Sequence, residues 1–370
     1  MHPSISDVAP NTRFEPAWTA SMIDSVTAMA WSADGEHLAV GSAEGDLVVA
    51  DAEGTVQWRG VLPEGVTVMG WHPRVAVLVV GTEDGTVLWW RPKSPGPILC
   101  RPGAWITSLA FASTQPYVAV GSGSEAVVFD LTGRERARLI SPRGLVPALA
   151  WARGPGDLAI AGAGGLDWYR VLADLDRNSC VAALAPRASY PAAGAPLVLA
   201  LNPDGNRLAS ADLCGALRVV DLTTGEETEL SGYPDRVRLL AWDAPGVGLA
   251  AVADDEVTIW LFDPGSTDPS SASPIPLTAH EDAIAAMAFG GLAGLLVTGG
   301  EDGRVVIWHA RDLSHPQVID VGEPVHTVAW HPWGRLVVGL RSGSVGAIDF
   351  IGGRVVGSAT TRQAWALPPT

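Results

Sequence analysis

Apolar and polar residues alternate along the chain in short runs, and one six-residue run recurs eight times. Each copy has a β-branched or small residue, two variable residues, an apolar residue, Ala or Gly, and then usually an aromatic residue. The copies end at Trp31, Trp71, Phe111, Trp151, Leu201, Trp242, Phe289 and Trp330. Successive ends are 40, 40, 40, 50, 41, 47 and 41 residues apart. This alternation predicts a strand, and its regular return predicts a repeat architecture.

The seventh period indicates what each repeat contains. Its expected strands are Ile284–Phe289, Leu295–Gly299, Arg304–Trp308 and a fourth, outer strand near Gln317–Asp320. Between the second and third strands, Glu301, Asp302 and Gly303 predict a tight hairpin turn. Four antiparallel strands cannot bury both of their faces alone, whereas sheets stacked radially can. We therefore predict an all-β fold: a single closed β-propeller of eight blades, each with four antiparallel strands. A seven-bladed ring is the alternative, and it would leave one copy outside.

The repeat also predicts the domain organisation. Residues 13–359 are expected to form the propeller, with tails at residues 1–12 and 360–370. Either Glu15–Ser21 or Arg354–Ser358 could supply the outer strand of the last blade, and we expect the N-terminal strand to be outermost there. In the 50-residue period, we expect an outer strand over Cys180–Leu184 followed by an extended loop over Pro186–Ala195.

Two segments resemble a known repeat family. Leu295–Ala310 reads LLVTGGEDGRVVIWHA and Leu78–Pro92 reads LVVGTEDGTVLWWRP, and both are similar to the WD-repeat consensus. Members of that family tie each blade with a hydrogen-bonded tetrad of His, Ser or Thr, Asp and Trp. The resemblance implies such a tetrad at His280, Thr298, Asp302 and Trp308. We expect these four residues to be structural and not catalytic, because they pair polar groups that would otherwise be buried alone.

Composition narrows the possible partners and the compartment. The 370-residue chain has a formal net charge of −16 and one lysine, Lys93. Phosphate binding needs clustered Lys and Arg, so nucleic acid and membrane surfaces are disfavoured as partners. The three cysteines are far apart, which favours a reducing compartment. With no apolar run of roughly eighteen residues and no secretory signal, a cytoplasmic location is expected.

Candidate catalytic and metal motifs all have a simpler interpretation. His72 and His331 both lie in Trp-His-Pro phrases, in the second and eighth periods. Because the first blade lies between those two blades, the two histidines are not expected to share a zinc ion. Adjacent carboxylates such as Glu301 and Asp302 fall in turns, and neighbouring strand residues point to opposite faces. A GxGxxA pattern at Gly246 precedes a strand where nucleotide binding needs a helix. We expect no catalytic residue, no metal and no cofactor.

The resemblance also implies where a partner would bind. WD-repeat proteins tend to bind partners through residues that flank the first apolar residue of the inner strand and through the residue before the turn Asp. The matching positions are Trp105, Thr107, Arg236, Arg238, His326, Thr27, Thr67, Glu83 and Glu301. Trp and Arg are the side chains that most often anchor interfaces. We therefore expect a non-catalytic scaffold that presents a propeller rim to one or more proteins.

An enzymatic or small-ligand-binding eight-bladed propeller is the competing class. Val49–Trp58 faintly resembles the repeat of quinone-cofactor dehydrogenases. The missing signal peptide and the missing cluster of calcium ligands argue against that class.

Overall fold

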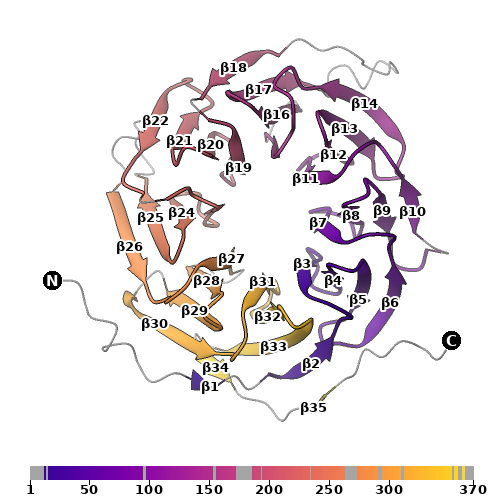
Figure 1. Ribbon diagram of the computed structural model, residues 1–370, viewed down its shortest axis with the longest axis vertical. Helices are drawn as coiled ribbons and strands as arrows, with labels where there is room; N and C mark the ends of the chain where they lie inside the picture. The colour runs from indigo at the N-terminus through magenta and orange to yellow at the C-terminus, as the bar shows by residue number, and fades with distance from the viewer. Residues whose placement is uncertain are drawn as a thin grey trace. The chain divides into compact units, whose positions relative to one another are not determined.

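The computed structural model describes residues 12–13, 16–94, 97–152, 156–171, 186–192, 194–233, 235–262, 273–290, 294–309, 312–351, 354–356 and 361–362. These residues form strands and turns, and the strands assemble into eight sheets, each built on four antiparallel strands (Figure 1). The prediction of an all-β, eight-bladed propeller fold is confirmed. We number the blades 1 to 8 in the order of their inner strands along the chain.

The chain divides into two compact units, of which the first takes its residues from 1–66, 254–258 and 275–370. This unit contains three complete blades. Blade 1 consists of β3 (Val26–Trp31), β4 (Leu38–Ser42), β5 (Asp46–Ala50) and β6 (Val56–Val61). Blade 7 consists of β27 (Ile284–Phe289), β28 (Leu295–Gly300), β29 (Arg304–His309) and β30 (Asp312–Asp320). Blade 8 consists of β31 (Val325–Trp330), β32 (Arg335–Leu340), β33 (Ser344–Ile351) and β2 (Trp18–Ser21).

Both ends of the chain contribute to blade 8. Strand β2, from the N-terminal part of the chain, pairs antiparallel with the first half of β33, with Trp18 opposite Ala347. Strand β34 (Arg354–Val356) pairs with the end of β33, where Asp349 lies opposite Val356. The two candidate segments therefore share one edge of β33, and the N-terminal one supplies the fourth strand. The short strands β1 (Thr12–Arg13) and β35 (Thr361–Arg362) add parallel pairs to β30 and β2.

The second unit takes its residues from 67–253 and 259–274. Blade 2 consists of β7 (Val66–Trp71), β8 (Leu78–Thr82), β9 (Val87–Trp90) and β10 (Ile98–Cys100). Blade 3 consists of β11 (Ile106–Phe111), β12 (Tyr117–Ser122), β13 (Glu125–Asp130) and β14 (Glu135–Ile140). Blade 4 consists of β15 (Leu149–Trp151), β16 (Asp157–Gly162), β17 (Gly165–Arg170) and β18 (Ala188–Pro191). Blade 5 consists of β19 (Pro196–Leu201), β20 (Arg207–Asp212), β21 (Leu217–Asp221) and β22 (Glu227–Leu230). Blade 6 consists of β23 (Leu239–Trp242), β24 (Gly248–Ala253), β25 (Glu256–Leu261) and β26 (Ser273–Thr278).

The expected loop over Pro186–Ala195 is wrong, because its centre forms β18, the outer strand of blade 4. Strand β18 pairs with β17 from Gly165 opposite Pro191 to Trp168 opposite Ala188. Ala188 and Tyr190 pack against the core of the blade, and between them Ser189 donates a hydrogen bond to Asp167 at 2.6 Å. The expected outer strand over Cys180–Leu184 lies outside the described residues.

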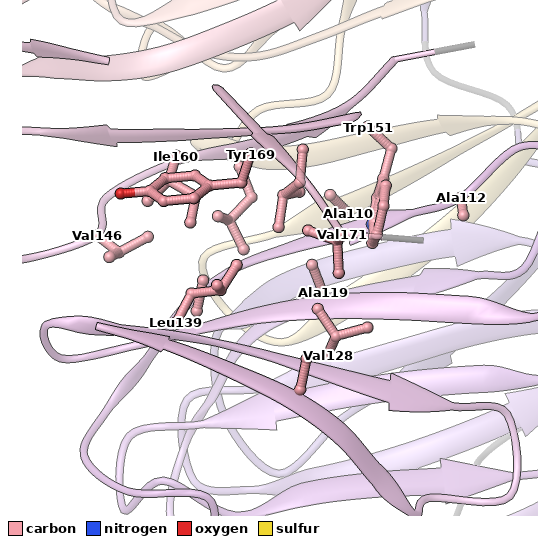
Figure 2. Close-up of a cluster of buried hydrophobic side chains, with 14 residues drawn as sticks. Ala110, Ala112, Ala119, Val128, Leu139, Val146, Trp151, Ile160, Tyr169 and Val171 are labelled. Atoms are coloured by element: carbon pink, nitrogen blue, oxygen red, sulfur yellow. The ribbon is translucent and has the colours of Figure 1, made fainter. Parts of the chain in front are cut away.

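The core lies between consecutive blades. In one cluster, Val128 and Leu139 of blade 3 face Ile160 and Tyr169 of blade 4 (Figure 2). All four side chains are buried. Because blade 3 is covered by blade 2 on one face and by blade 4 on the other, its second strand can be buried almost throughout, as residues 118–122 show. This packing holds the sheet edges, and the loops they carry, in fixed positions.

Candidate functional site

Each blade has one edge at which its inner strand begins, and we call it the entry edge. In blade 3 the strand register places Ile106 opposite Ser122, Ser122 opposite Glu125, and Glu125 opposite Ile140. The entry edge therefore consists of the segment that leads into the inner strand and the turn between the second and third strands. The predicted partner-binding residues lie on entry edges, because they occupy these repeat positions.

Three of them, Thr27, Thr67 and Thr107, are engaged inside the molecule. Each hydroxyl donates to the carbonyl of the first residue of the next inner strand, at 2.7, 2.7 and 2.6 Å. The acceptors are Val66, Ile106 and Val146. A hydroxyl has one hydrogen to donate, so these threonines connect blades and have none left for a partner. Their recurrence every 40 residues was the available signal in the sequence.

His326 and Glu301 lie together at the entry edges of blades 7 and 8. The Ser25 hydroxyl and Nδ1 of His326 share a hydrogen bond of 2.9 Å. Nε2 of His326 lies 3.6 Å from Glu301 Oε1, and Arg341 Nη1 lies 3.3 Å from Glu301 Oε2. Sequence reasoning missed Ser25 and Arg341, since their contacts depend on how neighbouring blades are staggered.

This group of four side chains resembles a nucleophile, base and carboxylate in residue type but not in geometry. A base that activates a serine needs a carboxylate hydrogen bonded to its second nitrogen. Here the distance from His326 to Glu301 exceeds hydrogen-bond length, and the carboxylate is held by Arg341. The group therefore forms a partly exposed charge network across three blades.

Trp105, Arg236, Arg238 and Glu83 are exposed. Trp105 is 54% exposed. Among the described residues, neither Arg236 nor Arg238 has an ion-pair partner for its guanidinium. Trp105 belongs to blade 3 and the two arginines lead into blade 6, so their convergence on one partner stays a prediction.

The four proposed tetrad residues of blade 7 are joined by hydrogen bonds. Nδ1 of His280 donates to both carboxylate oxygens of Asp302 at 3.1 Å. Nε2 of His280 accepts from the Thr298 hydroxyl at 2.8 Å, and Trp308 Nε1 donates to the same oxygen at 3.2 Å. His280, Thr298 and Trp308 are buried, so the side-chain polar atoms that these three residues contribute to the tetrad are paired away from water.

The Asp302 carboxylate is stabilised in its charged form. Burial acts to raise its pKa, but hydrogen bonds from His280 and from the amides of Glu281 and Arg304 outweigh burial and lower the pKa below its usual value. The two amides lie 2.9 and 3.0 Å from the carboxylate. Asp302 therefore holds the turn, the third strand and the segment before the inner strand together.

Other blades use Arg–carboxylate pairs near the same position. In blade 1, Arg59 of the outer strand forms a bidentate pair with Asp46 at 2.9 and 2.7 Å, and the Asp46 side chain has no exposed surface. In blade 3, Arg138 pairs with Glu125. Sequence reasoning missed these pairs, although a carboxylate at the start of a third strand and an Arg two residues before the end of the outer strand, diagonally across from it, were a usable signal.

His72 and His331 connect consecutive blades on the opposite edge. Nε2 of His72 donates to the Gln115 carbonyl at 3.2 Å, and Nε2 of His331 donates to the Gly35 carbonyl at 3.0 Å. Nδ1 of His331 accepts the amide of Trp333, which leaves no lone pair for a metal. Burial lowers the pKa of both histidines.

The described residues contain neither a cluster of metal ligands nor a membrane-spanning helix. No group of three or more His, Cys, Asp or Glu among them is placed to hold a metal ion. The described part of the chain also contains no helix with the length and apolar character to span a membrane.

Known proteins resemble this chain in repeat and in fold. The WD domain, G-beta repeat model matches residues 19–51 and 273–309, which contain most of blade 1 and most of blade 7. A ciliary WD repeat-containing protein, ctxp80 of Euplotoides octocarinatus, is 28% identical over 141 residues. That match covers 37% of this chain and 18% of the length of ctxp80.

A solved structure matches the chain almost end to end. The crystal structure of the computationally designed Ika8 protein aligns with a TM-score of 0.73 and 20% identity, covering 90% of this chain and 99% of Ika8. At that identity the match shows the fold alone. With two repeats matched directly and the other blades built on the same four-strand plan, the chain is a WD-repeat β-propeller.

Proposed function

We propose that this chain is a non-catalytic scaffold that binds one or more partner proteins through the entry edges of its blades. The exposure of Trp105 carries the proposal. Ten of the 14 tryptophans in the described part of the chain are buried, whereas Trp105 is left in solvent on an entry edge. An exposed aromatic side chain on a rigid sheet edge is the kind of anchor that protein interfaces use.

Two further observations support the same function. Arg236 and Arg238 offer guanidinium groups without an ion-pair partner among the described residues, and Arg side chains are enriched in binding hot spots. The network of Ser25, His326, Glu301 and Arg341 fixes polar groups on another set of entry edges, where they need no further ordering on binding.

We place the scaffold in the cytoplasm. Cys100 and Cys214 are free thiols, and burial raises the pKa of Cys100 to about 11, so this thiol stays protonated and slow to oxidise. The negative net charge and the single lysine support proteins, and not nucleic acid or anionic membranes, as partners.

Partner capture with matched variants tests the proposal. Tagged wild type, the double variant Trp105→Ala/Arg238→Ala and the control Trp333→Ala are compared by affinity purification and quantitative mass spectrometry. Trp333 is 74% exposed but lies in the turn between the first and second strands of blade 8, away from its entry edge. Losing one hot-spot anchor costs ~2 kcal/mol or more, roughly thirtyfold in affinity. The double variant should lose partners that the control retains, at unchanged melting temperature. Equal capture by all three proteins would contradict the assigned surface.

The enzymatic alternative has its own measurement. Purified protein is examined for quinone absorbance and for bound calcium. A quinone band together with one calcium ion per chain would replace the scaffold with a cofactor-dependent enzyme.

A further inference from the structure

Blade 8 exposes a tryptophan on the edge opposite to its entry edge. We call this edge, at which the inner strands end, the exit edge. Trp333 lies there in the turn between β31 and β32. It is 74% exposed, the largest fraction among the exposed large apolar residues of the described chain. The residues around it indicate what kind of partner this ring suits.

The indole of Trp333 lies against the neighbouring blade. Its backbone amide donates to Nδ1 of His331 at 3.0 Å, and Nε2 of His331 donates to the Gly35 carbonyl of blade 1 at 3.0 Å. Gly35 has a φ of +71°, and a Cβ added to it would lie 2.9 Å from Nε1 of Trp333. The indole therefore reaches over the turn between β3 and β4, and residues of two blades set its position.

This turn and the next one on the same edge are acidic. Asp34 and Glu36 flank Gly35, and both are exposed. The turn between β5 and β6 of the same blade adds Asp51 and Glu53. None of these four carboxylates has an ion-pair partner among the described residues. An exposed aromatic ring thus stands beside negative charge that the described part of the chain does not neutralise.

The described cationic groups closest to Trp333 along the chain do not change this balance. The guanidinium of Arg335 binds Asp349 at 2.6 Å within its own blade. Burial lowers the pKa of His331, although the Glu53 carboxylate acts to raise it, so the ring of His331 is neutral at pH 7. A cation from outside can therefore approach both the indole face and the carboxylates.

The connection between blades 2 and 3 shows that its hydrogen bonds need neither the ring nor the carboxylates. There His72 makes the same two bonds, to the Gln115 carbonyl at 3.2 Å and from the Arg74 amide at 3.2 Å. Arg74 thus occupies the position of the tryptophan, and Thr114 and Pro116 occupy the positions of the two acidic residues. The combination in blades 8 and 1 is therefore surplus to the connection itself.

We propose that the exit edge of blades 8 and 1 binds an arginine side chain of a basic partner segment, with the guanidinium stacked on Trp333 and paired with Asp34 or Glu36. A planar guanidinium can stack on an aromatic face and also pair with a carboxylate. The net charge of −16 attracts a basic segment and repels a second copy of this chain. This partner is additional to those bound through the entry edges.

Synthetic peptides test the chemistry directly. Three short fluorescein-labelled peptides carry Arg, Lys or citrulline at the same positions among Gly and Ser, and full-length protein is titrated into each by fluorescence polarisation. Citrulline keeps the planar shape of Arg without its charge. The Arg peptide should bind most tightly, and the Lys peptide should bind more weakly because an ammonium group lacks the planar fork. Equal affinity of the Arg peptide and either of the others would overturn the proposal.

Two variants locate the site. Trp333→Arg should weaken binding of the Arg peptide by roughly thirtyfold, the loss expected for a central anchor. Its melting temperature should not change, because blade 2 accommodates Arg74 at this position. Asp34→Asn keeps an acceptor for the Ser32 hydroxyl and removes one charge. It should weaken binding by up to about fivefold at low salt, and high salt should remove the difference.

Asp204→Asn is the matched control. Asp204 is exposed and occupies the position of Asp34 in the corresponding turn of blade 5, where it also precedes a glycine. This variant should bind the Arg peptide like the wild type. Equal loss in Asp34→Asn and Asp204→Asn would overturn the proposal, because the peptide would then follow the overall charge of the protein. Unchanged binding by Trp333→Arg would overturn it as well.

The two surfaces are distinguished by which partners each variant loses. Partners of the exit edge should depend on Trp333 and not on Trp105, so Trp333→Ala still serves as the control for partners that depend on Trp105 and Arg238. If the Arg peptide fails to bind while partner capture depends on Trp105 and Arg238, this inference falls and the scaffold function stands.

Discussion

Replacing Asp302 by Ala should destabilise the protein by about 2–4 kcal/mol. The carboxylate accepts hydrogen bonds from the His280 ring and from the amides of Glu281 and Arg304. His280 has no exposed side-chain surface, and Asp302 is only 5% exposed. A buried donor left without its partner costs about 1–3 kcal/mol. The loss of the hydrogen bonds from the His280 ring and from the part-buried Arg304 amide accounts for the expected destabilisation. The Glu281 amide adds little, because water can replace the lost acceptor there.

The matched control is Glu44→Ala. Glu44 occupies the same turn position in blade 1, but it is exposed and no His–Thr chain depends on it. Its loss should change the free energy of unfolding by less than about 0.5 kcal/mol, as is usual for surface positions. Urea titrations followed by tryptophan fluorescence give both midpoints, which can be compared directly if the slopes agree. Indistinguishable midpoints would refute the assigned role of the tetrad.

Acidification supplies a second readout for the same residue. The folded-state pKa of Asp302 lies below the usual Asp value of 3.8, so the stability that its carboxylate contributes is present above pH 3.8 and is lost as the pH falls through the folded-state pKa. The stability difference between wild type and Asp302→Ala should therefore be constant near neutrality and shrink below about pH 4. A difference that grows with acid would contradict the lowered pKa.

Three further predictions use the same unfolding assay. Thr67→Val should cost about 1 kcal/mol, because it removes the hydroxyl that bonds the next inner strand. Burial lowers the pKa of His72, so protonating its ring opposes folding, and wild type should lose stability as the pH falls below about 6.5; His72→Asn, which keeps a donor and an acceptor without titrating, should lose less. Arg59→Ala should cost about 3 kcal/mol because it leaves the carboxylate of Asp46 buried and unpaired, whereas Arg101→Ala, at an exposed pair, should cost under about 1 kcal/mol. Equal losses in the two Arg variants would show that burial of the pair is not what matters.

The strands could be predicted from the sequence because burial imposes their pattern. Each copy of the recurring phrase begins with a buried residue and ends in a large apolar one, and the phrase predicted the end of every inner strand correctly. Spacing alone misplaced the outer strand of blade 4, because that period contains extra residues and the repeat no longer fixes the position. The alternation of Ala188, Ser189 and Tyr190 was the better signal.

The contacts of the candidate site were harder to predict. Repeat position correctly selected His326 and Glu301 as neighbours of an entry edge, but it could not show that Ser25 and Arg341 engage them. It also could not show that the Thr107 hydroxyl donates a hydrogen bond to the Val146 carbonyl, which leads into the next blade. These contacts depend on the stagger between sheets and on side-chain direction, and a periodic pattern contains neither.

The pairing of Trp18 with Ala347 has a consequence for how the chain acquires its structure. During synthesis, β2 leaves the ribosome long before its partner strand β33 is made. Joining residues 18 and 347 spans 329 residues, whereas the outer pair Val49 and Trp58 of blade 1 spans nine. For an unstructured chain, this difference in span adds about 3 kcal/mol of loop-closure entropy. Blade 8 is therefore expected to be the last to assemble, with the edge of β33 open to pairing with other chains until it does. A circular permutant that moves residues 16–21 behind β33 should refold faster than the natural order.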